Sequence, residues 1–197
     1  MDELYETVNS IYCYPSSNVL VNKLDIHDNK KLAEVERKLV LLKLYELRQN
    51  KKIGKFNILH FLSIHKFLFE DIYPFAGKIR AEDIAKDSFR FAKWEYIEDQ
   101  LNTLLEKLSK DNFNNLSKEE MSKKLSYYMS ELNVLHPFRE GNGRTIREFI
   151  RELAFRYGYF LEIKAVNPEE MLLACIESVA NTKHLEILIY KCLKEID

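Results

Sequence analysis

The sequence is poor in the residues that interrupt secondary structure. It contains only 5 Gly and 4 Pro among 197 residues, and these two residue types mark many turns and helix ends. Hydrophobic residues make up 46% of the chain, which is enough for a sizeable core. Long helices joined by short loops are therefore expected, and the absence of repeats and low-complexity linkers predicts a single domain over residues 1–197.

The sequence also lacks an excess of either charge and any long apolar run. Its 30 basic and 31 acidic residues leave a net charge of -1, whereas proteins that bind nucleic acid usually carry a basic excess or stripe. No apolar run approaches the roughly 18 residues that a membrane span needs. We therefore expect neither nucleic acid nor a membrane as a partner.

Cysteine is scarce as well. The three cysteines are odd in number and form no CxxC pair, a pattern typical of reduced thiols in the cytoplasm. The first ten residues, MDELYETVNS, are acidic and polar, unlike a secretory signal. We expect a cytoplasmic protein, with action inside a host cell as the alternative if the chain is secreted.

Apolar residues at helical spacing predict that most of the chain is helical. One helix is expected over about 33–49 and the last over about 183–195, and others begin after Asn57, near Glu95, after Ser117, after Gly143 and after Asn167. Ser117 and Glu120 have capping-box spacing, Pro168 suits a first helical position, and Gly158 is a candidate C-terminal cap. The apolar face expected for the first helix consists of Val35, Leu39, Leu42 and Leu47.

One region departs from this helical pattern. Between Gly77 and Trp94 the sequence has no apolar helical face, and Phe89 and Phe91 alternate with polar residues. Alternation of this kind is typical of strands. We therefore predict a short β-hairpin within about 79–93, with its turn around Lys86-Asp87-Ser88.

The segment 136–147, HPFREGNGRTIR, carries the predicted chemistry. Gly141 and Gly143 flank Asn142 just before a helix, where glycine lets the backbone approach a ligand and the first-turn N–H groups attract anions. Arg144 and Arg147 are three residues apart and can clamp phosphate oxygens from neighbouring points on that helix. The segment therefore predicts a phosphate-binding site.

Two further residues of this segment suit catalysis. Glu140 offers a hard oxygen ligand, and Mg²⁺ typically binds one or two carboxylates together with substrate phosphates. A neutral imidazole at His136 can take the proton from an attacking hydroxyl. The segment thus predicts transfer of part of a nucleoside triphosphate, whereas a P-loop and an HExxH zinc site are both absent.

The segment 136–147 resembles the motif HPFx[D/E]GNGRxxR of the Fic (filamentation induced by cAMP) family at every defining position. Further segments also resemble the family: NVLVNK at 18–23, IHKFLFEDIYPFAGKIR at 64–80, and FRFA, which falls where the family has its flap. The resemblance covers nearly the whole chain. It implies a mainly α-helical Fic fold, a helical bundle with a short β-hairpin flap.

The resemblance also implies an activity. Family members typically transfer AMP from ATP to a Ser, Thr or Tyr hydroxyl of a target protein and release pyrophosphate. Carried over, His136 is the general base and Glu140 holds Mg²⁺ against the phosphates. Arg144 contacts the phosphates and Arg147 binds the γ-phosphate. The implied ATP- and phosphate-binding residues are Asn133, Arg139, Glu140, Gly141, Asn142, Gly143, Arg144, Thr145 and Arg147.

The flap and the third position of the Gly-Asn-Gly run, which is Gly143, refine this expectation. The resemblance implies that the target protein docks beside Lys86, Asp87, Ser88 and Phe89 by strand addition, although Asp87 stands where the family frequently has Gly. The Doc branch, which phosphorylates its target, resembles HPFxxGNKR. Gly143 occupies the position of that Lys, so adenylylation is expected rather than phosphorylation.

Many family members are inhibited by a glutamate in an [S/T]xxxE[G/N] motif that pairs with the second motif arginine. Thr182 and Glu186 match this spacing in the expected C-terminal helix of about 182–195, whereas Ile187 replaces Gly or Asn. Our hypothesis is that Glu186 pairs with Arg147 and suppresses activity. The alternatives are transfer of another group such as UMP, and a nucleotide-binding regulatory module or toxin controlled by a separate antitoxin. A homo-oligomer is a further expectation from the family.

Overall fold

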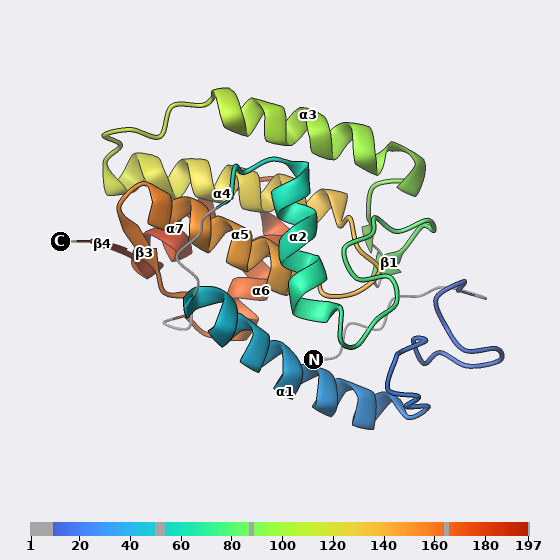
Figure 1. The fold of residues 1–197 in the computed structure, drawn as a ribbon. Helices are drawn as coiled ribbons and strands as arrows, with labels where there is room; N and C mark the ends of the chain where they lie inside the picture. The colour runs from blue at the N-terminus through green and yellow to red at the C-terminus, as the bar shows by residue number, and fades with distance from the viewer. Residues whose placement is uncertain (1–9, 50–53, 87–88, 164–165, 197) are drawn as a thin grey trace.

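The computed structural model describes residues 10–49, 54–86, 89–163 and 166–196, and this part of the chain is mainly helical (Figure 1). This confirms the predicted fold class. Two small antiparallel sheets accompany the helices. The elements in chain order are α1 (Asn29–Gln49), α2 (Ile58–Phe69), β1 (Ala85–Lys86), β2 (Phe89–Arg90), the 3-10 turn η1 (Trp94–Tyr96), α3 (Ile97–Lys110), α4 (Lys118–Leu135), α5 (Asn142–Arg156), β3 (Tyr159–Leu161), α6 (Pro168–Glu177), α7 (Lys183–Cys192) and β4 (Leu193–Glu195).

Side-chain caps define the starts of three helices. The Asn57 side chain accepts from the backbone N–H of His60 at the start of α2, and Asn167 caps α6 with proline at the first position. Ser117 and Glu120 form both halves of a capping box before α4. These caps satisfy N–H groups that have no partner inside the helix. All three predicted starts are confirmed.

Helices α4 and α5 form the centre of the bundle. Helix α4 packs against α3, α5 and α7, and α2 crosses α5; in Figure 1, α3 lies above α4 and α1 lies below α2 and α5. Helix α3 buries one apolar face, which consists of Ile97, Leu101, Leu104, Leu105 and Leu108. Because both α4 and α5 are covered on several sides, the loop between them is held by the core.

The predicted apolar face of α1 is partly wrong. Leu42 is 62% exposed, whereas the buried face of α1 consists of Leu32, Glu36 and Val40. A spacing of four residues places these three side chains on one face. A glutamate on a buried helix face requires a partner of opposite charge or a hydrogen bond, and Glu36 finds both at the site described below.

The last predicted helix is too long. Helix α7 ends at Cys192, and residues 193–195 form β4, which pairs antiparallel with β3 in the register Phe160↔Lys194. Gly158, at φ 87°, lets the chain turn after α5 into β3. This sheet joins residues that are more than 30 positions apart, so helical periodicity at the C-terminus could not indicate it.

The predicted hairpin is confirmed, with Ala85 opposite Arg90 and Lys86 opposite Phe89. The predicted turn residues Asp87 and Ser88 lie outside the described residues. Across the described part of the chain, no helix is both long and apolar enough to cross a membrane.

Candidate active site

The segment 136–147 comprises the loop 136–141, which connects α4 to α5, and the first residues of α5, which begins at Asn142 and therefore before the predicted start after Gly143. Gly141 precedes α5 with φ 79°, and a Cβ added there would lie 2.3 Å from the Phe69 ring. Only glycine fits this combination of a left-handed backbone and close packing. Gly143 lies in the helix, where an added Cβ would be 3.0 Å from Nη1 of Arg147.

Two buried polar side chains maintain the shape of this loop. The Asn142 amide accepts from the Phe138 N–H at 2.8 Å and donates to the Phe138 carbonyl at 2.7 Å. The Thr145 hydroxyl donates to the Gly141 carbonyl at 3.0 Å. Both side chains are fully buried. Neither side chain accepts from the first-turn N–H groups of α5, and N–H groups at this position of a helix are suited to binding an anion.

His136 ends α4 in the left-handed conformation, at φ 46° and ψ 62°. Its Nδ1 lies 3.1 Å from the carbonyl oxygen of Asn133. Because a carbonyl can only accept, this contact places the proton on Nδ1 and the lone pair of a neutral ring on Nε2. The ring stacks on Phe91 with a centroid distance of 3.9 Å. The sequence did not indicate Phe91 as a site residue.

A buried arginine secures the backbone of His136. Arg80 is 1% exposed, and its Nε donates to the His136 carbonyl at 2.9 Å. Its Nη atoms donate to the carbonyls of Glu82 and Ala92, on either side of the hairpin. Carbonyls at a helix C-terminus carry partial negative charge and lack helical partners, which suits a guanidinium. Arg80 therefore joins the base of the hairpin to the start of the loop 136–141.

Glu140 and Arg144 form an ion pair within the site. Arg144 Nη2 lies 3.1 Å from Glu140 Oε1, and the same oxygen accepts from the Gly141 N–H at 2.7 Å. Arg144 Nη1 lies 2.5 Å from Oε1 of Glu36 on α1. Burial lowers the pKa of Arg144, but Glu36 and Glu140 outweigh it and raise the pKa above its ordinary value. The sequence did not indicate Glu36 either.

His65 on α2 supports the loop 136–141 through a hydrogen bond to Glu140. Its Nδ1 accepts from the Gly77 N–H at 2.8 Å, so Nε2 carries the proton that it donates to the Glu140 carbonyl at 2.9 Å. The ring stacks on Phe138 with centroids 3.7 Å apart. Burial lowers the pKa of His65 to about 3, so the ring is neutral. His65 therefore connects α2 to both Gly77 and Glu140 through its two ring nitrogens.

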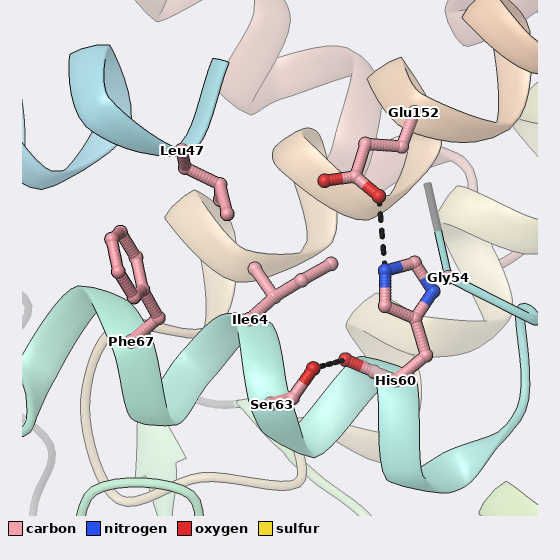
Figure 2. Close-up of a pocket in the computed structure, with 7 residues that line it drawn as sticks. All are labelled: Leu47, Gly54, His60, Ser63, Ile64, Phe67 and Glu152. Atoms are coloured by element: carbon pink, nitrogen blue, oxygen red, sulfur yellow. Dashed lines mark hydrogen bonds and ion pairs between the residues drawn. The ribbon is translucent and has the colours of Figure 1, made fainter. Parts of the chain in front are cut away.

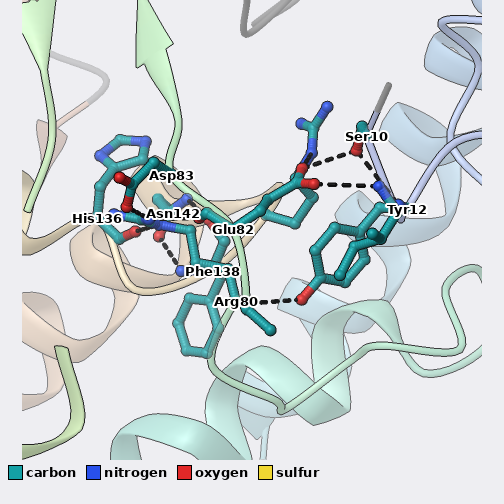
Figure 3. Close-up of polar contacts among 11 residues, drawn as sticks. Ser10, Tyr12, Arg80, Glu82, Asp83, His136, Phe138 and Asn142 are labelled. Atoms are coloured by element: carbon teal, nitrogen blue, oxygen red, sulfur yellow. Dashed lines mark hydrogen bonds and ion pairs between the residues drawn. The ribbon is translucent and has the colours of Figure 1, made fainter. Parts of the chain in front are cut away.

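Glu82 joins three segments at the edge of the site (Figure 3). Its Oε1 accepts from Arg139 Nε at 3.0 Å and from the Ser10 hydroxyl at 2.7 Å. Its Oε2 accepts from the Ile11 N–H at 3.1 Å. Arg139 is therefore directed toward Glu82, and its contact with ATP stays a prediction.

Arg147 and Asn133 lie near Cys175 of α6. Burial raises the pKa of the Cys175 thiol to about 11, and Arg147 and Asn133 each lower it. The Nδ2 atom of Asn133 is buried, and the Asn133 side chain lies against the Cys175 thiol. The contact of Asn133 with ATP stays a prediction.

The predicted inhibitory residues form a contact of their own. The Thr182 hydroxyl donates to Glu186 Oε1 at 2.8 Å, and Lys183 Nζ lies 3.5 Å from Oε2. These contacts occupy Glu186 at the start of α7, and the pair with Arg147 stays a prediction.

Two of the predicted docking residues, Lys86 and Phe89, pair with each other across the hairpin.

A separate pocket of about 320 Å³ lies away from the catalytic loop (Figure 2). Glu152 and His60 pair at 2.9 Å in its wall. Glu152 is ten residues beyond Asn142, which corresponds to about 15 Å along α5. The pocket contains none of the predicted site residues; it is lined by Leu47, Gly54, His60, Ser63, Ile64, Phe67 and Glu152.

The sequence model of the Fic/DOC family matches residues 55–154, about half of the chain. This match covers the hairpin, α3, α4 and the catalytic loop. The chain therefore belongs to the Fic/DOC family, and the predicted family is confirmed.

Two curated relatives extend the comparison. The chain is 41% identical to the protein adenylyltransferase VbhT of Bartonella schoenbuchensis over 97% of its own length. It spans only 40% of VbhT. It is also 35% identical to the probable protein adenylyltransferase y4lH of Sinorhizobium fredii, covering 88% of this chain and 90% of that protein.

A solved structure supports the fold. The BepC protein of Bartonella tribocorum, solved with bound AMPPNP, superposes with a TM-score of 0.88 at 25% identity. The alignment covers 94% of this chain and 97% of that one. The fold described here is therefore the Fic fold over nearly its whole length.

Proposed function

We propose that this chain is a protein adenylyltransferase, which transfers AMP from ATP to a Ser, Thr or Tyr hydroxyl of a target protein and releases pyrophosphate. The observation that carries the proposal is the placement of His136 and the N-terminus of α5 at the two ends of one short loop. The predicted enzyme class agrees with the names of the curated relatives VbhT and y4lH.

His136 supplies the general base. The Asn133 carbonyl accepts a hydrogen bond from Nδ1–H of His136, so Nε2 is the atom that accepts the proton of the attacking hydroxyl. The Phe91 stack and the Arg80 bond restrict the ring and its backbone. A base held in one orientation needs little reorganisation in the transition state.

The N-terminus of α5 and the motif arginines bind the phosphates. Its first-turn N–H groups and partial positive charge stabilise the charge that develops on the α-phosphate. Arg144 and Arg147 lie on the same helix three residues apart and supply two cations. Since no Lys replaces Gly143, the cradle can accommodate in-line attack at the α-phosphorus.

Mg²⁺ fits this site through Glu140. No group of three or more His, Cys, Asp or Glu suited to a metal exists within residues that the structure describes, so a metal here requires substrate oxygens as well. Mg²⁺ commonly binds in this way, to one carboxylate and phosphates. When bound, it would neutralise charge on the phosphates, and Glu140 would be its protein ligand.

The proposal is tested by incubating the protein with ATP labelled at either the α- or the γ-phosphate, followed by intact mass measurement. We expect label from the α-position only and a mass gain of one AMP. His136→Ala should abolish the transfer, whereas His27→Ala, at an exposed histidine, should leave it unchanged. Label from the γ-position would establish phosphorylation and refute the proposal. Replacing ATP by UTP tests UMP transfer.

The hairpin is the proposed docking element for the target. A strand of the target would add beside Lys86 and Phe89 and present its hydroxyl toward His136. The contact of Phe91 with the His136 ring supports this, because Phe91 follows β2 directly. Asp87 and Ser88 belong to the same proposed element.

Glu186 is the proposed inhibitory residue. We expect Glu186→Gly and Glu186→Ala both to increase self-adenylylation, because each removes the carboxylate that would pair with Arg147. Lys183→Ala is the matched control, since it removes a partner of Glu186 but leaves the carboxylate. If neither Glu186 variant changes the rate while His136→Ala abolishes it, inhibition by Glu186 is excluded.

Partners beyond the target protein stay predictions. A separate antitoxin would be detected by co-purification from the source cell, and a homo-oligomer by light scattering of the pure chain. One Fic domain over residues 1–197 and a cytoplasmic location are part of the same proposal.

A further inference from the structure

Glu36 lies 108 residues before Arg144 in the chain, yet it contacts Arg144 directly in the first turn of α5. Arg144 Nη1 lies 2.5 Å from Glu36 Oε1, and the Tyr73 hydroxyl donates to Glu36 Oε2. Glu36 is 8% exposed. A buried carboxylate is tolerated only when its oxygens are paired, and both oxygens of Glu36 have a partner.

The guanidinium of Arg144 bridges two carboxylates. It joins Glu36 on one side and Glu140 Oε1 at 3.1 Å on the other, and it lies 4.8 Å over the Phe69 ring. These contacts fix its plane from three directions. Because a guanidinium is planar and donates in a fixed fork, its orientation determines where the Glu140 carboxylate can lie.

We infer that Glu36 is a positioning residue for the proposed reaction, which holds Arg144 so that Glu140 is oriented and charged for Mg²⁺. The inference rests on the proposed function, which makes Glu140 the metal ligand. Glu36 itself touches neither the phosphates nor the metal. It acts on the metal through Arg144, as residues behind a metal ligand commonly do.

Charge gives the direction of the effect. Two carboxylates and one guanidinium sum to a formal charge of −1, which favours a cation beside Glu140. Without the charge of Glu36, the formal charge of the group is zero. Arg144 then has Glu140 as its one charged partner in this group and binds it more strongly. The guanidinium then competes with Mg²⁺ for that carboxylate. Both effects weaken Mg²⁺ binding.

Glu36→Gln tests the inference, because the amide keeps the volume of the side chain and removes its charge. In the adenylylation assay the Mg²⁺ concentration for half-maximal rate should rise about tenfold, in line with the effect of residues behind metal ligands. The rate at saturating Mg²⁺ should stay within about threefold of wild type. Tyr73→Phe is the matched control. It removes the other hydrogen bond of Glu36 but keeps the Arg144 pair, so its Mg²⁺ requirement should stay at the wild-type value.

A second readout needs no turnover. The amide N–H of Gly141 donates to Glu140 Oε1, so its NMR signal reports on that carboxylate when Mg²⁺ is titrated in the presence of α,β-methylene-ATP, which supplies phosphate oxygens but cannot transfer AMP. The midpoint should be about tenfold higher for Glu36→Gln than for wild type. Equal midpoints, no response of Gly141 in wild type, or the same increase in Tyr73→Phe would overturn the inference. A wild type that responds as expected but transfers no AMP would refute the proposed function alone.

Discussion

The guanidinium of Arg80 donates to the backbone carbonyl of His136 at 2.9 Å, although 56 residues separate them. The same side chain reaches carbonyls on both sides of the hairpin. One buried guanidinium therefore contacts both the backbone of the proposed general base and the proposed docking element. Without it, several carbonyls would be buried without partners.

Arg80→Lys should lower both stability and rate. Lysine keeps the charge but has no planar fork with which to reach all the carbonyls that accept from Arg80, which are those of Glu82, Ala92, Leu135 and His136. Each orphaned buried acceptor costs about 1–3 kcal/mol, so we expect the free energy of unfolding in urea to fall by roughly 2–4 kcal/mol. kcat should fall more than KM for ATP rises, because the orientation of His136 is affected. The exposed Arg37→Lys is the control, and equal effects of the two variants would contradict the role of Arg80.

Gly141→Ala should be far more destabilising than Gly158→Ala. Both glycines have positive φ, at 79° and 87°, and therefore share the backbone strain of about 1–2 kcal/mol. Only Gly141 has a neighbour, because a Cβ there would lie 2.3 Å from the Phe69 ring, whereas nothing lies within 4 Å of Gly158. Overpacking should add about 1–3 kcal/mol for Gly141→Ala in denaturant unfolding. Equal losses of unfolding free energy in the two variants would show that the Phe69 ring moves aside without an energetic penalty.

Gly143→Ala should separate activity from stability. Gly143 lies in the first turn of α5 without positive φ, and alanine is favoured over glycine in helices by about 1 kcal/mol. The unfolding free energy should therefore stay the same or rise slightly. The added Cβ would lie 3.0 Å from Nη1 of Arg147, which must move by a few tenths of an ångström, so KM for ATP should rise modestly. An unchanged KM would contradict an effect of this contact on ATP binding.

The stability of the protein should fall in mild acid because of His65. Burial lowers the folded-state pKa of His65 to about 3, below the ordinary value of 6.5. As the pH falls from about 6.5 toward 3, His65 therefore binds a proton in the unfolded chain but not in the folded protein. Folding then loses up to about 1.4 kcal/mol per pH unit. His65→Gln should remove this part of the slope between pH 6.5 and 5, measured by urea unfolding. A slope unchanged by the substitution would show that other groups cause it.

Glu82→Ala should release the segment around Ile11. The carboxylate accepts from the Ile11 N–H and the Ser10 hydroxyl while it pairs with Arg139. Amide hydrogen exchange of Ile11 should be faster by about tenfold, which corresponds to roughly 1.4 kcal/mol. Asp83→Ala is the control, because Asp83 accepts from Trp94 instead. Equal exchange at Ile11 in both variants would contradict the role of Glu82.

Local patterns predicted the elements that local interactions determine. The caps at Asn57, Ser117 and Asn167 depend on neighbours within three residues, and the structure has all three. The hairpin between Lys86 and Phe89 was also indicated by its alternation. No local pattern indicated the pairing of β4 with β3, because the two strands are short and lie far apart in the sequence. The prediction for Leu42 was wrong because apolar residues also occur on exposed helix faces.

The sequence by itself determined the family and was sufficient to predict the chemistry of the segment 136–147, because both depend on residue types and spacings that are local. Only the tertiary structure decided which side chains support that loop. Glu36, His65, Arg80 and Phe91 reach it from other segments, 45 to 108 residues away from their partners. Such contacts follow from the packing of α1, α2 and the hairpin around α4 and α5, and no local pattern records them.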